Sequence, residues 1–219
     1  MNVSLYPLQR LLERIYRVRL GYRVDDFLIM DSRLAFRLEG ETAVPLREKL
    51  LVRQEQDGLA LSLFLDPAVV RCLSADNPFH RIHEGNLDAF LLALEGVSHF
   101  LYLGWKAGLE RQVSLLELEL QAEVDKFVAT LLLLRRQCRS CAPAPVRMRL
   151  FEQCRFGAHL EGESLQRYRH ASRYAGKYCW RLEDRYLRRR RVSAMMEELR
   201  HFYRLPQQQK IRLIELGPT

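Results

Sequence analysis

The chain has 219 residues, of which 48% are hydrophobic and 28% charged, and its formal net charge is +8. This composition suffices for one large or two small domains with a buried core, and we find neither an internal repeat nor a low-complexity region. The sequence also excludes a typical signal peptide, and its longest apolar segments are too short or too interrupted for a membrane span. Five cysteines, an odd number, fit a reducing compartment. We therefore expect a cytoplasmic protein that does not engage a membrane.

The N-terminal part of the sequence predicts a small sheet with a leading helix. Residues 4–19 have the apolar spacing of an amphipathic helix. Residues 22–31 are expected to be extended, and residues 32–47 to form a strand and then a loop, because apolar and polar side chains alternate there. Residues 50–55 and 59–65 flank a turn and alternate more clearly, which is typical of an antiparallel hairpin.

The helices that follow are predicted mainly from their first residues. Asp66-Pro67 is typical of a helix start. Residues 86–105 form a predicted helix with Asn86 as its cap, and residues 114–137 begin with a Ser-x-x-Glu capping box. The connection between the two long helices is short, which favours an antiparallel helical hairpin. Their apolar surfaces extend nearly all round, so we expect this hairpin to be the buried core.

The segment Ala142-Pro143-Ala144-Pro145 is the best candidate for a linker. It separates residues 1–141, an α+β part with the central helix pair, from residues 142–219, although one continuous domain is the alternative. Residues 138–219 carry 18 Lys and Arg against 8 Asp and Glu, a balance of +10, which leaves −2 for residues 1–137. The predicted fold is therefore α+β, with a small N-terminal antiparallel sheet, a central antiparallel helical hairpin and a basic, all-helical C-terminal section.

Residues 164–191 form the most strongly charged predicted helix. Apolar residues gather on one side at a spacing of three and four residues, and cations recur every fourth residue on the other side. Tyr174 and Trp180 lie among the arginines, where their rings can stack on bases or on guanidinium groups. The residues that we predict to bind an anionic partner are Arg169, Arg173, Lys177, Trp180, Arg181, Arg185, Arg188 and Arg189.

This row of cations supports three hypotheses. Like charges four residues apart repel, so the row is locally unfavourable unless an anion lies along it. The leading hypothesis is a non-enzymatic binding or adaptor protein that docks on nucleic acid or on an acidic protein surface. A subunit that buries these arginines in a larger assembly is an alternative. A plain solvated face is the third, since arginine has good helix propensity and a long stem that covers apolar surface. The oligomeric state is not indicated.

Four potential zinc ligands follow the predicted helix pair. They are Cys138, Cys141, Cys154 and His159, with a C-x2-C-x12-C-x4-H spacing that is within the range of small zinc sites. The alternative is a set of free thiols, because buried cysteine without a ligand is common. We favour the free thiols and expect no cofactor, with zinc as the second possibility.

The central helices also carry acidic side chains and a histidine that could hold a hard metal cation. These are Glu95 and His99 on the first helix, and Glu119, Glu123 and Asp125 on the second. Such inward carboxylates hold Mg²⁺, Mn²⁺ or iron in helical bundles, so a metal-dependent hydrolase is a further alternative. We favour a polar stripe on each helix, because the Glu-x-x-x-His spacing differs from that of di-iron bundles. Asp125 departs from this interpretation: it projects from an apolar side and needs a partner such as an arginine or His99.

Overall fold

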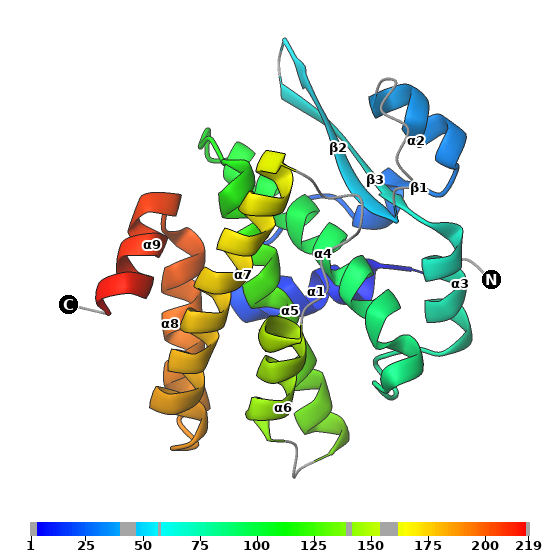
Figure 1. The fold of residues 1–219 in the computed structure, drawn as a ribbon. Coiled ribbons are helices and arrows are strands. Elements are labelled where there is room, and N and C mark those ends of the chain that lie inside the picture. The colour runs from blue at the N-terminus through cyan, green and yellow to red at the C-terminus, as the bar shows by residue number, and fades with distance from the viewer. Residues whose placement is uncertain (1–3, 40–46, 57, 139–141, 154–161, 218–219) are drawn as a thin grey trace. The chain divides into compact units, whose positions relative to one another are not determined.

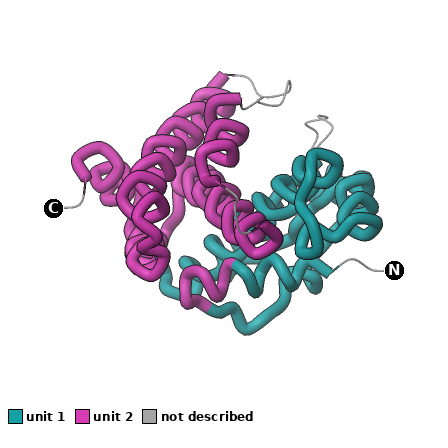
Figure 2. The backbone as a smooth tube through the Cα atoms, turned by 90° about the horizontal axis from the view of Figure 1, so that it is seen from below, with its two compact units in different colours: residues 1–11, 19–111 teal, residues 12–18, 112–219 magenta. Residues whose placement is uncertain are grey.

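The computed structural model describes residues 4–39, 47–56, 58–138, 142–153 and 162–217 (Figure 1). It is mostly helical with a three-stranded mixed sheet, which confirms the predicted α+β class. The chain forms two compact units: unit 1 comprises residues 1–11 and 19–111, and unit 2 comprises residues 12–18 and 112–219 (Figure 2). Helix α1 (Tyr6–Tyr16) contributes residues to both units.

Unit 1 contains the sheet. After α1 its elements are the 3-10 helix η1 (Val24–Phe27), β1 (Leu28–Ile29), α2 (Ser32–Glu39), β2 (Glu48–Glu55), β3 (Gly58–Leu65), α3 (Pro67–Ala75) and α4 (Glu84–Ala107). Strand β3 is central, antiparallel to β2 and parallel to β1. Leu50 lies opposite Leu63 and Gln54 opposite Leu59, which confirms the predicted hairpin. The parallel strand β1 makes the sheet mixed, whereas the sequence predicted an antiparallel one.

Helix α4 packs closely on this sheet at Gly96. A Cβ atom at Gly96 would lie 2.6 Å from Leu63 Cδ1, closer than real Cβ atoms come, and 3.0 Å from Glu48 Oε1, which is tighter than most real contacts. Glycine therefore lets the helix approach the strands. Leu61, Leu63 and Leu65 on one face of β3 are buried, and so is Phe64 on the other face.

Residues 32–39 form helix α2, so the strand predicted there is wrong. The Asp31 carboxylate accepts hydrogen bonds from the backbone N–H groups of Arg33 (2.8 Å) and Leu34 (3.3 Å), as a helix-capping side chain does. Within α2, Ala35 is buried and Phe36 is exposed. The apolar alternation in this segment therefore did not mark a sheet face, and the predicted loop at residues 40–46 lies outside the described residues.

The caps of α3 and α4 were predicted with different success. The Asp66 carboxylate accepts the Ala68 N–H at 2.6 Å, which confirms the start of α3. For α4 the cap is His83, whose Nδ1 accepts the Gly85 N–H at 3.1 Å. Asn86 takes the reciprocal position of the capping box, where its Oδ1 accepts the His83 N–H at 3.0 Å. Asn86 is thus part of the cap but not the capping residue.

Helix α4 is also long and apolar enough, by length and composition, to cross a bilayer, alone among the helices in the described residues. In its most apolar window, 67% of the residues are buried inside the structure. A core helix meets the same criteria, so this finding is weak evidence for a membrane span.

Unit 2 is built from helices. After residues 12–18 its elements are α5 (Leu115–Gln137), α6 (Pro143–Arg147), the π-helical turn η2 (Met148–Glu152), α7 (Gly162–Leu182), the π-helical turn η3 (Glu183–Leu187), α8 (Val192–Arg204) and α9 (Gln207–Leu216). Helices α5 and α7 pack along each other. Aromatic rings stack in the core: Tyr16 on Tyr203 (centroids 3.9 Å apart) and Tyr178 on Phe202 (4.1 Å).

The two units do not divide the chain where the sequence suggested a linker. The chain passes from unit 1 to unit 2 after Arg111, whereas the division predicted between residues 141 and 142 lies within unit 2, where Pro143 begins α6. Ser114 accepts the Glu117 N–H at 3.0 Å, which confirms the predicted start of α5. Because α4 belongs to unit 1 and α5 to unit 2, the hairpin predicted for them stays a prediction.

Candidate anion-binding surface

Helix α7 has one buried and one exposed side. Its buried stripe consists of Ala171, Ser172, Ala175, Tyr178, Cys179 and Leu182. Arg169, Arg173, Lys177 and Trp180 are exposed. At 100° per residue these four side chains fall within about 80° of each other, on the side opposite the stripe. We call these four residues the α7 strip.

The predicted row of cations does not stay on this exposed side. Each step of four residues turns about 40° around the helix axis, so a long row must wind toward the buried stripe. Arg181 and Arg185 are accordingly only half-exposed. The cations therefore recur regularly in the sequence, but Arg181 and Arg185 face neighbouring helices of unit 2.

Two cations of the row contact α9. The Arg181 guanidinium donates hydrogen bonds to the carbonyl oxygens of Leu213 (2.6 Å) and Ile214 (2.5 Å), near the C-terminal end of that helix. A cation is favourable there because the carbonyl end of a helix is partially negative. Lys177 Nζ lies 2.6 Å from Glu215 Oε2. The hydrogen bond from Lys177 lowers the pKa of the Glu215 carboxyl, and the charges of Arg173 and Arg181 lower it further.

The next cations lie beside acidic residues of η3 and α8. Arg185 lies 3.8 Å from a Glu198 carboxylate oxygen. Arg188 lies 3.6 Å from Glu183 and 3.5 Å from Asp184, yet 60% of its side chain is exposed. Arg189 is exposed, as are the two arginines that follow it. Of the eight predicted residues, Lys177, Arg185 and Arg188 thus have acidic partners, and Arg181 has carbonyl partners.

Arg169, Arg173 and Trp180 are the members that keep the predicted character. Neither arginine makes an ion pair with a residue that the structure describes. The Arg173 guanidinium lies 5.1 Å from the Tyr174 ring centroid, in a cation–π contact. Trp180 is 49% exposed. The exposed pair Lys177–Glu215 adjoins them, and such surface pairs contribute little to stability, so the lysine can exchange its partner.

An open hollow of about 670 Å³ lies at the N-terminal end of α7. Its lining residues are Leu116, Gly162, Glu163, Gln166, Arg167 and His170. His170 is exposed beside Arg169, on the same half of the helix as the α7 strip. The hollow therefore continues this surface toward the start of the helix.

The predicted carboxylates lie in both units. In unit 1, Glu95 and His99 are on α4, and His99 Nδ1 lies 3.7 Å from Glu48 Oε1 of β2. In unit 2, Glu119 is buried on α5, and Glu123 forms an ion pair with Lys126 at 2.5 Å. These contacts do not decide between polar positions and metal ligands, so the metal hypothesis stays a prediction.

Asp125 has partners that sequence reasoning did not name. It is 1% exposed, and its Oδ1 accepts hydrogen bonds from the Tyr16 hydroxyl and from Gln121 Nε2 (2.8 Å). Gln121 Oε1 in turn accepts a bond from Lys210 Nζ at 2.7 Å, and Lys210 is fully buried. Burial, followed by the charge of Asp125, raises the pKa of Tyr16 well above its ordinary value. The partners of Asp125 thus include a tyrosine and a glutamine, and the carboxylate is part of a buried hydrogen-bond network.

The zinc hypothesis stays a prediction. Cys138 is exposed and forms no disulfide with another described residue. Cys141, Cys154 and His159 lie outside the described residues.

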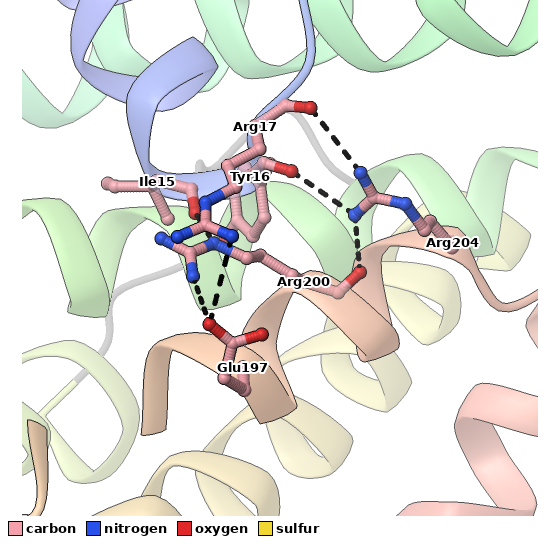
Figure 3. A network of polar contacts seen from close by, with 6 residues as sticks. All are labelled: Ile15, Tyr16, Arg17, Glu197, Arg200 and Arg204. Carbon is pink, nitrogen blue, oxygen red and sulfur yellow. Dashed lines mark hydrogen bonds and ion pairs between the residues drawn. The ribbon is translucent and has the colours of Figure 1, made fainter. Parts of the chain in front are cut away.

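Several arginines of unit 2 bind backbone carbonyl groups, a role that the sequence did not predict. Arg200 Nε donates to the Ile15 carbonyl (3.1 Å), and Arg204 donates to those of Tyr16 (3.2 Å) and Arg17 (3.4 Å) (Figure 3). Glu197 holds Arg200 at 2.5 Å. Arg17 has φ +51°, so α1 ends on a left-handed arginine without a glycine.

Comparison of the chain with models of protein families, with curated protein sequences and with solved structures found no match.

Proposed function

We propose that the protein is a non-enzymatic binding protein whose α7 strip docks on an anionic partner, either nucleic acid or an acidic protein surface. The observation that carries the proposal is the exposed pair Arg169 and Arg173, without ion pairs to described residues, on the same face as the exposed Trp180. Residues 138–219, which include α7, have a net charge of +10, and this charge attracts polyanions at long range.

The contacts of the remaining cations reduce the set of residues that are available to bind a partner. Arg181, with its two bonds to α9, and Arg185, beside Glu198, are already engaged within unit 2. The proposal therefore assigns binding to the α7 strip and to exposed arginines after η3, Arg188 and Arg189, rather than to the whole row. An anion at the strip would also relieve the repulsion between Arg169 and Arg173, which are one helical turn apart.

The test is the double variant Arg169→Gln with Arg173→Gln, measured with a labelled polyanion over a range of salt concentrations. For nucleic acid, the slope of log affinity against log salt should fall in magnitude by about two, because two phosphate contacts are lost. The matched control is Arg33→Gln with Arg37→Gln, which removes two exposed arginines at the same spacing on α2. If both double variants bind as the unaltered protein does, the α7 strip is not the docking surface.

A further inference from the structure

We infer that the anionic partner is a single-stranded nucleic acid, with a base stacked on Trp180 and phosphates bound by Arg169 and Arg173. This inference rests on the proposed function and specifies its partner. It depends on three properties of Trp180: its place on the helix, its exposure, and the chemistry of its neighbours.

Trp180 lies on the same line of the helix surface as the two arginines. At 100° per residue its direction falls about midway between those of Arg169 and Arg173. At 1.5 Å per residue, Trp180 is about 10 Å further along the axis than Arg173, which is itself about 6 Å beyond Arg169. A strand that runs along α7 can therefore meet two guanidinium groups and then an aromatic face.

The Trp180 ring is available for stacking. It is 49% exposed. All of α7 is described, and Trp180 is its one exposed large apolar side chain. Within the described ranges of the chain, neither a ring nor a cation stacks on it. A buried tryptophan is commonly explained by packing, but a half-exposed one beside Lys177 is not.

The neighbours of Trp180 favour a base over a protein surface. Of the helix positions three and four residues away, Lys177 is exposed and Asp184 is partly exposed, whereas Gly176 packs against Phe151. Tryptophan at a protein interface is typically surrounded by contacts that exclude water. Base stacking needs only a flat aromatic face beside cations that track the backbone, which is what the α7 strip presents.

A single strand fits better than a duplex for the same reason. In a duplex the base faces are covered by their neighbours, so an aromatic side chain cannot reach them without unstacking the helix. A single strand exposes its bases, and stacking tolerates any sequence. Lys177 can add a third phosphate contact once it leaves the exposed Glu215.

The experiment uses the full chain and four probes: oligo(dT) of about 15 nucleotides, a duplex of the same length, inorganic polyphosphate and poly-glutamate. Trp180→Leu keeps an apolar side chain but removes the ring, and should weaken oligo(dT) binding by about tenfold or more. Binding of polyphosphate, which has no bases, should not change. Trp180→Phe keeps an aromatic face and should lose less affinity than Trp180→Leu.

A second measurement needs no change at position 180. The chain has two tryptophans, Trp105 and Trp180. In Trp105→Phe, oligo(dT) should therefore quench the fluorescence of Trp180 directly, and polyphosphate should not. Unchanged oligo(dT) affinity in Trp180→Leu together with absent quenching would overturn the inference. So would tighter binding of the duplex, or equal binding of poly-glutamate. In each of these cases the proposed function still stands if the Arg169 and Arg173 double variant weakens binding of a polyanion.

Discussion

Asp125 shows at the scale of one residue what the sequence could and could not predict. A carboxylate between leucines on a helix indicates a buried charge that needs a partner. The structure supplies the Tyr16 hydroxyl and the Gln121 amide. Tyr16 is 109 positions away in sequence, and no local pattern connects it to Asp125. The need for a partner was therefore predictable. Gln121 is one turn away on the same helix, whereas the choice of Tyr16 depends on tertiary packing.

Replacement of Asp125 by alanine should destabilise unit 2. The Tyr16 hydroxyl and the Gln121 amide would lose their buried acceptor, and we expect the free energy of unfolding to fall by about 2–4 kcal/mol. Asp125→Asn keeps an acceptor oxygen and should cost less. Urea unfolding followed by circular dichroism measures both variants, with the exposed Asp26→Ala as a control within about 0.5 kcal/mol of the unaltered protein. Equal stability of Asp125→Ala and Asp26→Ala would contradict the network.

At the scale of elements, local signals predicted helix starts better than helix ends. Asp66 and Ser114 cap their helices with side chains close in sequence, so a short motif suffices. The carbonyl groups at the ends of α1 and α9 instead accept hydrogen bonds from arginines of other helices. Arg181 of α7, for example, donates to two carbonyl groups of α9. The sequence shows these arginines only as surplus charge. Part of the predicted binding surface was therefore assigned to side chains that hold the C-terminal helices together.

The contact between α7 and α9 also predicts how the binding surface responds to one carboxylate. Glu215 holds Lys177 and faces the α7 strip. In Glu215→Gln the lysine is released and a repelling charge is removed, so affinity for a polyanion at low salt should rise by about twofold to fivefold. The matched control is Glu55→Gln, which removes an exposed carboxylate paired with Arg53 on β2. A lower affinity in Glu215→Gln, or an equal rise in the control, would contradict this arrangement.

At the scale of the whole molecule, composition and periodicity predicted the α+β class but not the two units. The class follows from which segments alternate and which repeat every three to four residues. The division follows from contacts across the chain, because residues 12–18 join residues 112–219. The surplus of positive charge does lie in the C-terminal part. How many of these cations are exposed depends on how far the row of cations on α7 winds around the helix axis.

The buried phenols of unit 2 predict a loss of stability in alkali. Burial raises the pKa values of Tyr16, Tyr178 and Tyr203 well above their ordinary value of 10.0, and that of Cys179 above 9.0. These groups hold their protons more tightly in the folded state, so their contribution to stability is complete below the unfolded pKa values and is lost as pH rises above about 9–10. Far-ultraviolet circular dichroism should therefore change together with phenolate absorbance. Complete ionisation of all nine tyrosines in a protein with unchanged dichroism would contradict this prediction.

The arginine contacts on the end of α1 have a consequence for synthesis. Arg200 and Arg204 bind carbonyl groups that precede them by 185 to 188 positions. On the ribosome, the first helix therefore emerges long before the residues that hold its last turn, and Leu12 and Ile15, buried in the finished protein, have no complete core to enter. Contacts so distant in sequence form slowly. We therefore expect a nascent chain that has not yet released α8 to aggregate more readily than the complete chain.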